Sequence, residues 1–355
     1  MSKDKKLTEK QLENIALYTK YRPKDFDEVL GQKHITDILG ESIKNEKLGH
    51  AYLFIGSRGT GKTSVARILA KKIGTTENDL YEIDAASNTS VENIRDLNES
   101  INTSPFNSKY KVYILDEVHM LSKSAFNALL KTLEEPPTHV IFILATTEPH
   151  KIPETVVSRC ETYTFKTPNR EILKKMIRQT AEAEGIGLNN GAIDLIAILG
   201  DGSFRDTHTI LQKLLRTEAV TRDSEISVDE VERVTGAPKT SLINNILEAI
   251  VKNDYESGLR TISEARENNV DAKVLMHLLL EKYRAALLMK IAPKEKTLYS
   301  NSVSEDDIKF LDRLVSENSD KIDSKKLLGL LNVASDMSKS SLAFLPLEIF
   351  LVETK

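Results

Sequence analysis

The sequence predicts an α/β fold, in which a core with a parallel sheet precedes a helical C-terminal half. Three observations support this prediction. The strand-like run AYLFI (51–55) leads directly into a glycine-rich loop and then into a helical run. A second apolar run, KVYILDE (111–117), ends in two acids, as expected at the carboxyl edge of a parallel sheet. From Pro238 onward the chain keeps helical spacing with few strand signals.

Length and composition indicate a soluble protein of more than one domain. The chain has 355 residues, of which 40% are apolar and 29% charged, and two or three domains are expected at this length. The longest apolar runs, such as HVIFILA, are far shorter than the ~20 residues that span a bilayer. The charged N-terminus, MSKDKKLTEKQLENIA, does not have the apolar centre of a secretory signal. We therefore expect a cytoplasmic protein with no membrane partner.

Charge and cysteine content narrow the possible partners further. The net charge is −4, so any contact with nucleic acid must come from a local surface rather than from a basic chain. The single cysteine, Cys160, excludes a disulfide within the chain and a cysteine-rich zinc site. A reducing compartment is the expected setting.

The glycine-rich loop predicts a phosphate site. The segment GSRGTGKT (56–63) matches the pattern GxxxxGK[ST] and lies between a buried strand and the helical run SVARILAKKI. Its glycines let backbone N–H groups surround a polyphosphate, and the following helix adds its positive dipole end. An ordinary glycine-rich turn is the alternative, and the strand–loop–helix context argues against it. The residues expected to bind nucleotide here are Gly56, Ser57, Arg58, Gly59, Thr60, Gly61, Lys62, Thr63 and Ser64.

Three further side chains complete the predicted chemistry. Lys62 would reach the β- and γ-phosphates, and the Thr63 hydroxyl would bind Mg²⁺. Asp116, at the end of its strand, also suits the Mg²⁺ shell, while the adjacent Glu117 suits a base that orients the attacking water. Two acidic residues after a strand are also common in loops that have no catalytic role. The pairing with the glycine-rich loop favours the catalytic interpretation.

The next strand-like run, HVIFILATT (139–147), ends in two threonines. The Thr147 hydroxyl could sense the γ-phosphate or hold the attacking water. Taken alone, threonines at such a position are more often turn formers.

Five segments in this order resemble a known family. They are YTKYRPKDFDEVLGQ (18–32), GHAYLFIGSRGTGKTS (49–64), DEVHMLSKSAFNALLKTLEEPP (116–137), LATTEPHKIPETVVSRC (144–160) and GDGSFRD (200–206). Together they closely resemble the gamma/tau ATPase subunits of the bacterial DNA polymerase III clamp loader, which belong to the AAA+ ATPases. The resemblance runs from about residue 17 to the end of the chain. Replication factor C small subunits are relatives, but FNALLKTLEEPP is more similar to the bacterial form.

The resemblance implies an ATPase that acts in chromosomal replication. Its members use ATP and Mg²⁺ in a multi-subunit ring that opens a sliding clamp and places it on primed DNA. The implied partners are further copies of the chain, delta-type and delta-prime-type subunits, the sliding clamp and primer–template DNA. The implied location is the cytoplasmic, nucleoid-associated replisome, as part of the polymerase III holoenzyme.

The same resemblance assigns roles to residues outside the glycine-rich loop. The adenine pocket is implied at Tyr21, Arg22, Pro23 and Val29. Arg205, expected at the start of a helix capped by Ser203, would touch the γ-phosphate of its own subunit. A surface arginine paired with Asp206 is the alternative for this position.

Arg159, in the triplet SRC (158–160), is implied to be an arginine finger that reaches the nucleotide of the neighbouring subunit. The residues support this, because IPETVVSR predicts a short helix with Pro153 in its first turn and Arg159 at the exposed far end. Lys62 already serves the phosphates of its own subunit, so Arg159 is available to another. Cys160 has no obvious base or companion thiol, and a buried small hydrophobic side chain is its expected role.

Contacts with DNA are expected at two helix starts. A helix with a capping box formed by Thr89 and Glu92 would present Arg95, and a helix over 122–135 would present Lys123. Basic residues at these places suit a sequence-independent grip on the phosphate backbone. A solvated helix face is an equally good explanation for each of them.

Two departures from the family are visible. The family usually carries a small cysteine-rich zinc module after the phosphate-loop helix, where this chain has only GTTENDL (74–80), so no zinc is expected. The longer family product also continues into linker and polymerase-binding regions, whereas this chain ends at Lys355. We expect either a naturally short form or a truncated one.

The predicted organisation has four parts. An N-terminal extension (1–16) precedes an AAA+ core (17–165) with a five-stranded parallel sheet covered by helices on both faces. A helical lid (166–237) and an all-helical oligomerisation collar (238–355) follow. Three other functions remain alternatives: a hexameric helicase or branch-migration motor, a non-hydrolysing stator subunit and a small-molecule kinase. Intact Lys62, Thr63, Asp116 and Glu117 argue against the stator, and no acceptor-binding segment supports the kinase.

Overall fold

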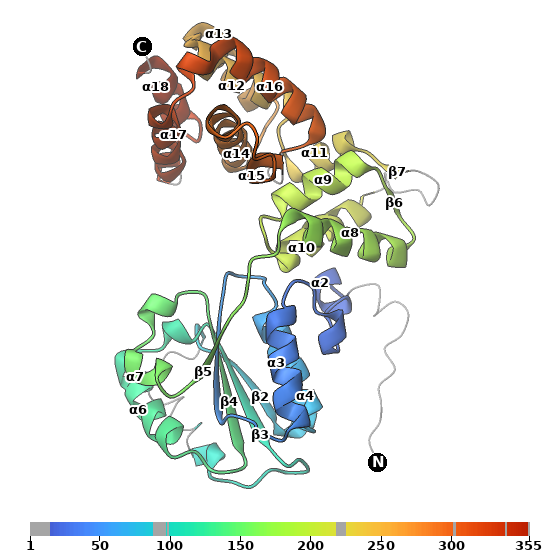
Figure 1. Cartoon of the computed structure of the whole chain (residues 1–355), viewed down its shortest axis with the longest axis vertical. Helices are drawn as coiled ribbons and strands as arrows, with labels where there is room; N and C mark the ends of the chain where they lie inside the picture. The colour runs from blue at the N-terminus through green and yellow to red at the C-terminus, as the bar shows by residue number, and fades with distance from the viewer. Residues whose placement is uncertain are drawn as a thin grey trace. The chain divides into compact units, whose positions relative to one another are not determined.

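The computed structural model describes residues 15–87, 97, 99–217, 225–300, 303–337 and 339–353. By their contacts, these residues form two compact units (Figure 1). The first unit contains the chain up to Pro168 together with Gly202–His208, and the second contains Asn169–Asp201 and the chain from Thr209 onward. None of the described helices is both long enough and apolar enough to span a membrane.

The first unit is built on a five-stranded parallel sheet, as predicted. Its strands are β1 (Ala51–Ile55), β2 (Leu80–Asp84), β3 (Lys111–Asp116), β4 (Val140–Thr146) and β5 (Glu161–Thr164), in the order β2-β3-β4-β1-β5. Strands β1, β3 and β4 lie inside the sheet and are buried on both faces. This explains why they consist of nearly continuous apolar runs rather than alternating ones.

Helices cover both faces of this sheet (Figure 1). Along β1, Tyr52 and Phe54 pack in one apolar cluster with α3 (Lys33–Lys44) and α4 (Lys62–Lys72). Leu53 points to the opposite face and packs with α6 (Lys123–Glu134) and α7 (Glu154–Val157). The shorter elements of this unit are α2 (Leu17–Lys20), η1 (Phe26–Glu28), η2 (Glu77–Asp79), η3 (Val118–Met120) and η4 (Pro149–Lys151).

The second unit is mainly helical. Its first helices are α8 (Arg170–Glu184), α9 (Asn190–Leu199), most of α10 (Phe204–Leu215) and α11 (Val228–Thr235). A short parallel pair, β6 (Gly187–Leu188) and β7 (Glu225–Ile226), accompanies them and was not predicted from the sequence. The remaining helices are α12 (Thr240–Lys252), α13 (Tyr255–Glu267), α14 (Ala272–Ile291), α15 (Thr297–Ser300), α16 (Glu305–Asn318), η5 (Ser319–Lys321), α17 (Ser324–Met337) and α18 (Leu345–Glu353).

Side-chain caps mark where several of these helices begin. Asn169 accepts the N–H of Ile172 at the start of α8, and Asn189 does the same for Ala192 at α9. Ser227 forms a complete capping box with Glu230 at α11. Such caps satisfy backbone donors that a helix leaves unpaired, and each contributes about 1 kcal/mol.

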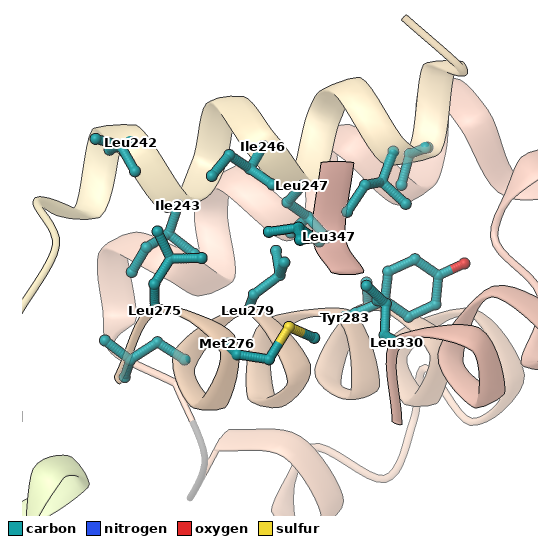
Figure 2. Close-up of a cluster of buried hydrophobic side chains, with 14 of the residues drawn as sticks. Leu242, Ile243, Ile246, Leu247, Leu275, Met276, Leu279, Tyr283, Leu330 and Leu347 are labelled. Carbon is teal, nitrogen blue, oxygen red and sulfur yellow. The ribbon is translucent and has the colours of Figure 1, made fainter. Parts of the chain in front are cut away.

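The core of the second unit surrounds α14. Figure 2 shows side chains of α12, including Ile243 and Leu247, facing Leu275, Leu279 and Tyr283 of α14. Burying an aliphatic side chain of this size stabilises the fold by about 1.5–3 kcal/mol. The predicted division into lid and collar near residue 237 stays a prediction, because helices from both predicted parts belong to this one unit.

Candidate nucleotide-binding site

The glycine-rich loop joins β1 to α4 at the carboxyl edge of the sheet. Gly61 precedes α4 with a φ of 103°, a backbone conformation that strongly favours glycine. Gly59 has a φ of 74°, and a Cβ added there would lie 2.1 Å from Ser203 Oγ. The Gly59 carbonyl also accepts the N–H of Phe204 at 3.0 Å. Glycine at position 59 therefore lets the start of α10 approach the loop.

Lys62 is the first residue of α4 and folds back onto the loop. Its ammonium donates to the carbonyl oxygens of Gly56 at 2.7 Å and Ser57 at 3.0 Å. The residue is only 6% exposed, and burial lowers the pKa of its side chain although Glu117 and Asp116 oppose that change. A buried cation whose hydrogen bonds, in the part of the chain that the structure describes, go to neutral carbonyls is well prepared to bind a phosphate.

Thr63 and Asp116 meet as the sequence predicts for a magnesium site. The Thr63 hydroxyl donates to Asp116 Oδ2 at 2.7 Å, from the start of α4 to the end of β3. Hydroxyl and carboxylate oxygens are ligands that Mg²⁺ accepts, and Mg²⁺ usually takes only one or two such protein ligands besides water and phosphate. The pair therefore fits Mg²⁺. No group of three or more histidine, cysteine, aspartate and glutamate side chains that could hold a metal ion occurs within the described ranges.

Glu117 turns the chain sharply after β3. Its φ of 48° lies in the left-handed region, which is uncommon for a residue other than glycine and concentrates at functional sites. Its N–H donates to Asp116 Oδ1 at 3.0 Å. Its Oε2 atom accepts the hydroxyl of Thr147 at 3.0 Å, so the two residues expected to handle the attacking water lie together.

Two residues of the site were missed by sequence reasoning. Gln32 is fully buried, donates to the carbonyl oxygens of Thr60 at 3.4 Å and Lys166 at 2.7 Å, and accepts the Lys166 N–H at 3.0 Å. It thereby ties the loop to the segment after β5. His119 follows Glu117 by two residues and lies between Glu117 and Glu148. Its position in DEVH, immediately after the paired acids, was the available signal.

One predicted adenine-pocket residue, Tyr21, lies beside α10. The Tyr21 ring lies parallel to His208 at a centroid distance of 6.2 Å, and the Arg205 guanidinium lies 5.0 Å from the centroid of the Tyr18 ring. Ser203 caps α10 as predicted, since its Oγ accepts the N–H of Asp206 at 3.1 Å.

The other residues of that predicted pocket are partly buried. Burial, followed by the nearby charge of Arg67, lowers the pKa of Arg22. Pro23 is half-buried, and Val29 packs against the apolar cluster under α3 and α4.

Arg159 lies two residues beyond the end of α7. Its guanidinium donates to the carbonyl oxygen of Thr155 at 2.7 Å and forms an ion pair with Glu134 at the end of α6. The helix is shorter than predicted, because it begins after Pro153, which is its N-cap rather than part of its first turn. Cys160 packs against the α6/α7 cluster, and burial raises the pKa of its thiol to about 11. The side chain is partly buried, rather than buried as expected. A thiol that is protonated at neutral pH is a poor nucleophile.

The two predicted DNA-contact residues differ in what can be said of them. Arg95, with the capping box that was expected before it, lies outside the described residues. Lys123 is exposed at the first position of α6, where Ser122 caps the helix by accepting the N–H of Ala125 at 3.2 Å. A contact of Lys123 with DNA stays a prediction.

Asp79 organises the short stretch that stands where the family carries its zinc module. Its carboxylate is fully buried and accepts the N–H groups of Phe106 at 2.6 Å and of Asn107 and Ser108 at 3.0 Å. Burial opposes ionisation, but these hydrogen bonds prevail and lower the pKa of Asp79 to about 2. The carboxylate thus holds the loop before β3 against η2.

The sheet order, the phosphate loop and the paired acids after β3 define the AAA+ P-loop fold. A solved structure with this fold is similar: the Thermotoga maritima RuvB Holliday junction branch migration motor matches with a TM-score of 0.52 and 20% identity. The match covers 65% of this chain and 79% of that one, and it bears on the fold alone.

Sequence relatives identify the family. The family model described as "DNA polymerase III, delta subunit" matches residues 31–86 and 74–169. The chain is 40% identical over 300 residues to DNA polymerase III subunit tau of Bacillus subtilis (strain 168), covering 78% of this chain and 52% of that protein. It is 33% identical over 311 residues to DNA polymerase III subunit gamma of Buchnera aphidicola subsp. Baizongia pistaciae (strain Bp), covering 81% and 83%. The chain therefore belongs to the gamma/tau family of DNA polymerase III subunits, and it spans about half the length of the tau relatives.

Proposed function

We propose that this chain is an ATP-hydrolysing subunit of a clamp loader, which opens a sliding clamp and places it on primed DNA during replication in the bacterial cytoplasm. The observation that carries the proposal is the convergence of Thr63, Asp116, Glu117 and Thr147 beside the phosphate loop. Family membership favours the clamp-loading role among the functions that a P-loop fold supports.

In the proposed reaction, the Lys62 ammonium moves away from the loop carbonyls and binds the β- and γ-phosphates. The move replaces two neutral acceptors by charged oxygens, which form stronger hydrogen bonds. Mg²⁺, held by Thr63 and Asp116, would neutralise charge on the phosphates. Glu117 then orients the attacking water and accepts its proton, while the Thr147 hydroxyl holds one carboxylate oxygen in place.

Arg159 is proposed to complete the site of a neighbouring subunit. Its present partner, Glu134, is about half exposed, and Arg159 is one-third exposed. Exposed ion pairs contribute only about 0–1 kcal/mol, so exchanging Glu134 for a phosphate needs little free energy. Arg205 is proposed to touch the γ-phosphate within its own subunit, from the start of α10.

Assembly with other copies and with delta-type and delta-prime-type subunits is proposed through the C-terminal helices. Apolar side chains that are 36–62% exposed lie on α17, α18 and the turn between them. Patches of this kind mark protein interfaces. They are Leu328, Leu331, Leu342, Leu345, Ile349 and Val352.

Steady-state ATP hydrolysis tests the proposal. It would be measured for the chain alone, and then with the sliding clamp, delta-type and delta-prime-type subunits and primed DNA from the same source. Strong stimulation that requires both the clamp and a primer–template junction supports clamp loading. Turnover that ignores the clamp but rises with plain duplex or single-stranded DNA would indicate a motor instead.

A further inference from the structure

His119 is a buried imidazole between two carboxylates, and nothing in the proposed reaction uses it. Its side chain is only 6% exposed. Nδ1 lies 3.4 Å from Glu117 Oε2 and 3.1 Å from Thr146 Oγ1, while Nε2 lies 3.2 Å from Glu148 Oε1. Each ring nitrogen therefore has a different acidic partner.

The local fold brings this ring to the site. The left-handed turn at Glu117 leads into η3, where the Glu117 carbonyl accepts the N–H of Met120 at 2.9 Å. This turn places His119 against the end of β4. There Thr146 is fully buried, and its hydroxyl oxygen accepts the Glu148 N–H at 3.0 Å. Residues from the ends of two adjacent strands thus enclose the imidazole.

Glu148 is anchored by side chains that follow it in the chain. Glu148 Oε2 lies 2.9 Å from Lys151 Nζ and 3.6 Å from His150 Nε2. The hydrogen bond from Lys151 is the main cause of the lowered pKa of Glu148, and the other oxygen of this carboxylate, Oε1, lies 3.2 Å from His119 Nε2. The orientation of the ring is therefore set on the side remote from Glu117.

Both contacts with Glu117 fall on the same carboxylate oxygen. Thr147 donates to Oε2 at 3.0 Å, and His119 Nδ1 approaches that oxygen at 3.4 Å. Within the described part of the chain, Oε1 makes no hydrogen bond. One oxygen of Glu117 thus lies close to two neighbouring side chains, and the other is available to a water molecule.

We propose that His119 is a positioning residue for Glu117, and that Glu148 holds His119 in the orientation this requires. The inference rests on the proposed ATPase function, in which Glu117 orients the attacking water. His119 acts through Nδ1, and Thr147 donates a hydrogen bond to the same carboxylate oxygen. Loss of such restraint lowers the rate of the chemical step without weakening nucleotide binding.

Two conservative variants of the full chain separate the two faces of the ring. In His119→Asn, the amide nitrogen occupies the position of Nδ1 and can still reach Glu117. In His119→Gln, the amide nitrogen occupies the position of Nε2 and reaches only Glu148. We expect His119→Gln to lower kcat by about 10–100-fold, with KM for ATP and the affinity for a fluorescent nucleotide unchanged. His119→Asn should retain most of the turnover, and Glu148→Gln should fall between them.

Thermal unfolding and a Glu117→Gln variant make the outcome decisive. If His119→Asn and His119→Gln lost kcat equally, and in proportion to their loss of thermal stability, the role of His119 would be purely structural. That result would overturn the proposal. Normal kcat in both, with Glu117→Gln inactive, would overturn it while leaving the proposed function intact. Full turnover by Glu117→Gln would instead remove Glu117 as the base, and both proposals would fail at that point.

Discussion

The two units of the molecule each bury a lysine near acidic residues, but the two lysines have different partners. In the second unit, Lys282 Nζ lies 2.5 Å from Asp307 Oδ1 and 2.8 Å from Asn244 Oδ1. Asp307 also accepts the N–H of Ser304 at 3.2 Å, so both ends of the pair are satisfied within the protein. In the first unit, the hydrogen bonds that Lys62 makes within the described residues go to the carbonyl oxygens of Gly56 and Ser57.

Burial lowers the pKa of both lysines, yet the consequences differ. The Lys282–Asp307 ion pair is buried and its hydrogen bonds are made within the protein, so it mainly affects the stability of the helical core. The Lys62 ammonium has lost much of its hydration, and the protein replaces it only in part with hydrogen bonds to carbonyl oxygens. A bound phosphate would supply the missing interactions. Variants of Lys62 should therefore change nucleotide binding, and variants of Lys282 should change stability.

Arg159 should show the largest effect on activity. Arg159→Ala should lower turnover of the assembled, DNA-stimulated complex by roughly 10³-fold, because an arginine supplied to a neighbouring site stabilises charge in the transition state. ATP binding, measured with a fluorescent nucleotide, should stay largely intact. Glu134→Gln is the matched control, since it releases Arg159 and should not lower turnover. If Arg159→Ala weakened nucleotide affinity alone, with turnover normal at saturation, the role in a neighbouring site would be wrong.

Lys282 should show the largest effect on stability. Lys282→Ala leaves the Asp307 carboxylate buried without its cation, which costs about 3–5 kcal/mol of the free energy of unfolding. Urea unfolding measures this loss. The control is Lys309→Ala on α16, the helix that carries Asp307, because the Lys309 pair with Asp306 is exposed and contributes about 0–1 kcal/mol. Equal losses of unfolding free energy in the two variants would contradict the distinction between the buried and the exposed ion pair.

A variant of Lys62 tests whether the buried lysine of the first unit serves nucleotide binding rather than stability. Lys62→Ala should weaken ATP binding by roughly 10–100-fold, because charge-assisted hydrogen bonds contribute about 1.5–3 kcal/mol. The free energy of unfolding should not fall, since the variant removes a cation that is already poorly solvated. Near-normal affinity in a fluorescent-nucleotide titration would discard the phosphate-loop assignment.

Asp79 should show the smallest effect and a dependence on pH. Asp79→Asn removes the charge that three backbone N–H groups donate to, and it should cost about 1–3 kcal/mol of unfolding free energy near neutral pH. Because folding lowers the pKa of Asp79 from 3.8 to about 2, its contribution is present above pH 3.8 and disappears as pH falls toward 2.

Urea unfolding of both proteins at several pH values checks this expectation. The difference in unfolding free energy between wild type and Asp79→Asn should narrow as pH falls from about 5 to about 3. A difference that stays constant over that range would show that the Asp79 charge does not brace the loop.

Local patterns in the sequence predicted much of the core. The strand at 51–55 has the predicted bounds, and the phosphate loop lies between that strand and α4 as expected. Strand, loop and helix signals lie within one short stretch of the chain, so neighbouring residues determine them. The meeting of Thr63 with Asp116 also followed, because the carboxyl ends of parallel strands share one edge of a sheet.

Other features depend on residues that are far apart in the sequence. The pair β6–β7 joins residues 187–188 to 225–226, and each strand is too short to have a pattern of its own. Asp79 finds its donors at 106–108, and Lys282 finds Asp307, across loops that no local rule specifies. Arg159 was expected at a helix end, but its pairing with Glu134 required the packing of α6 beside α7.

The sequence by itself determined the fold class of the core and the family, and it singled out the residues proposed to bind phosphate, because each is encoded by adjacent residues with strict steric and charge requirements. Only the tertiary structure decided what surrounds Glu117. Thr147 and His119 reach that carboxylate because β3 and β4 are hydrogen-bonded neighbours whose ends meet. The register of the sheet, rather than any single motif, thus places His119 between Glu117 and Glu148.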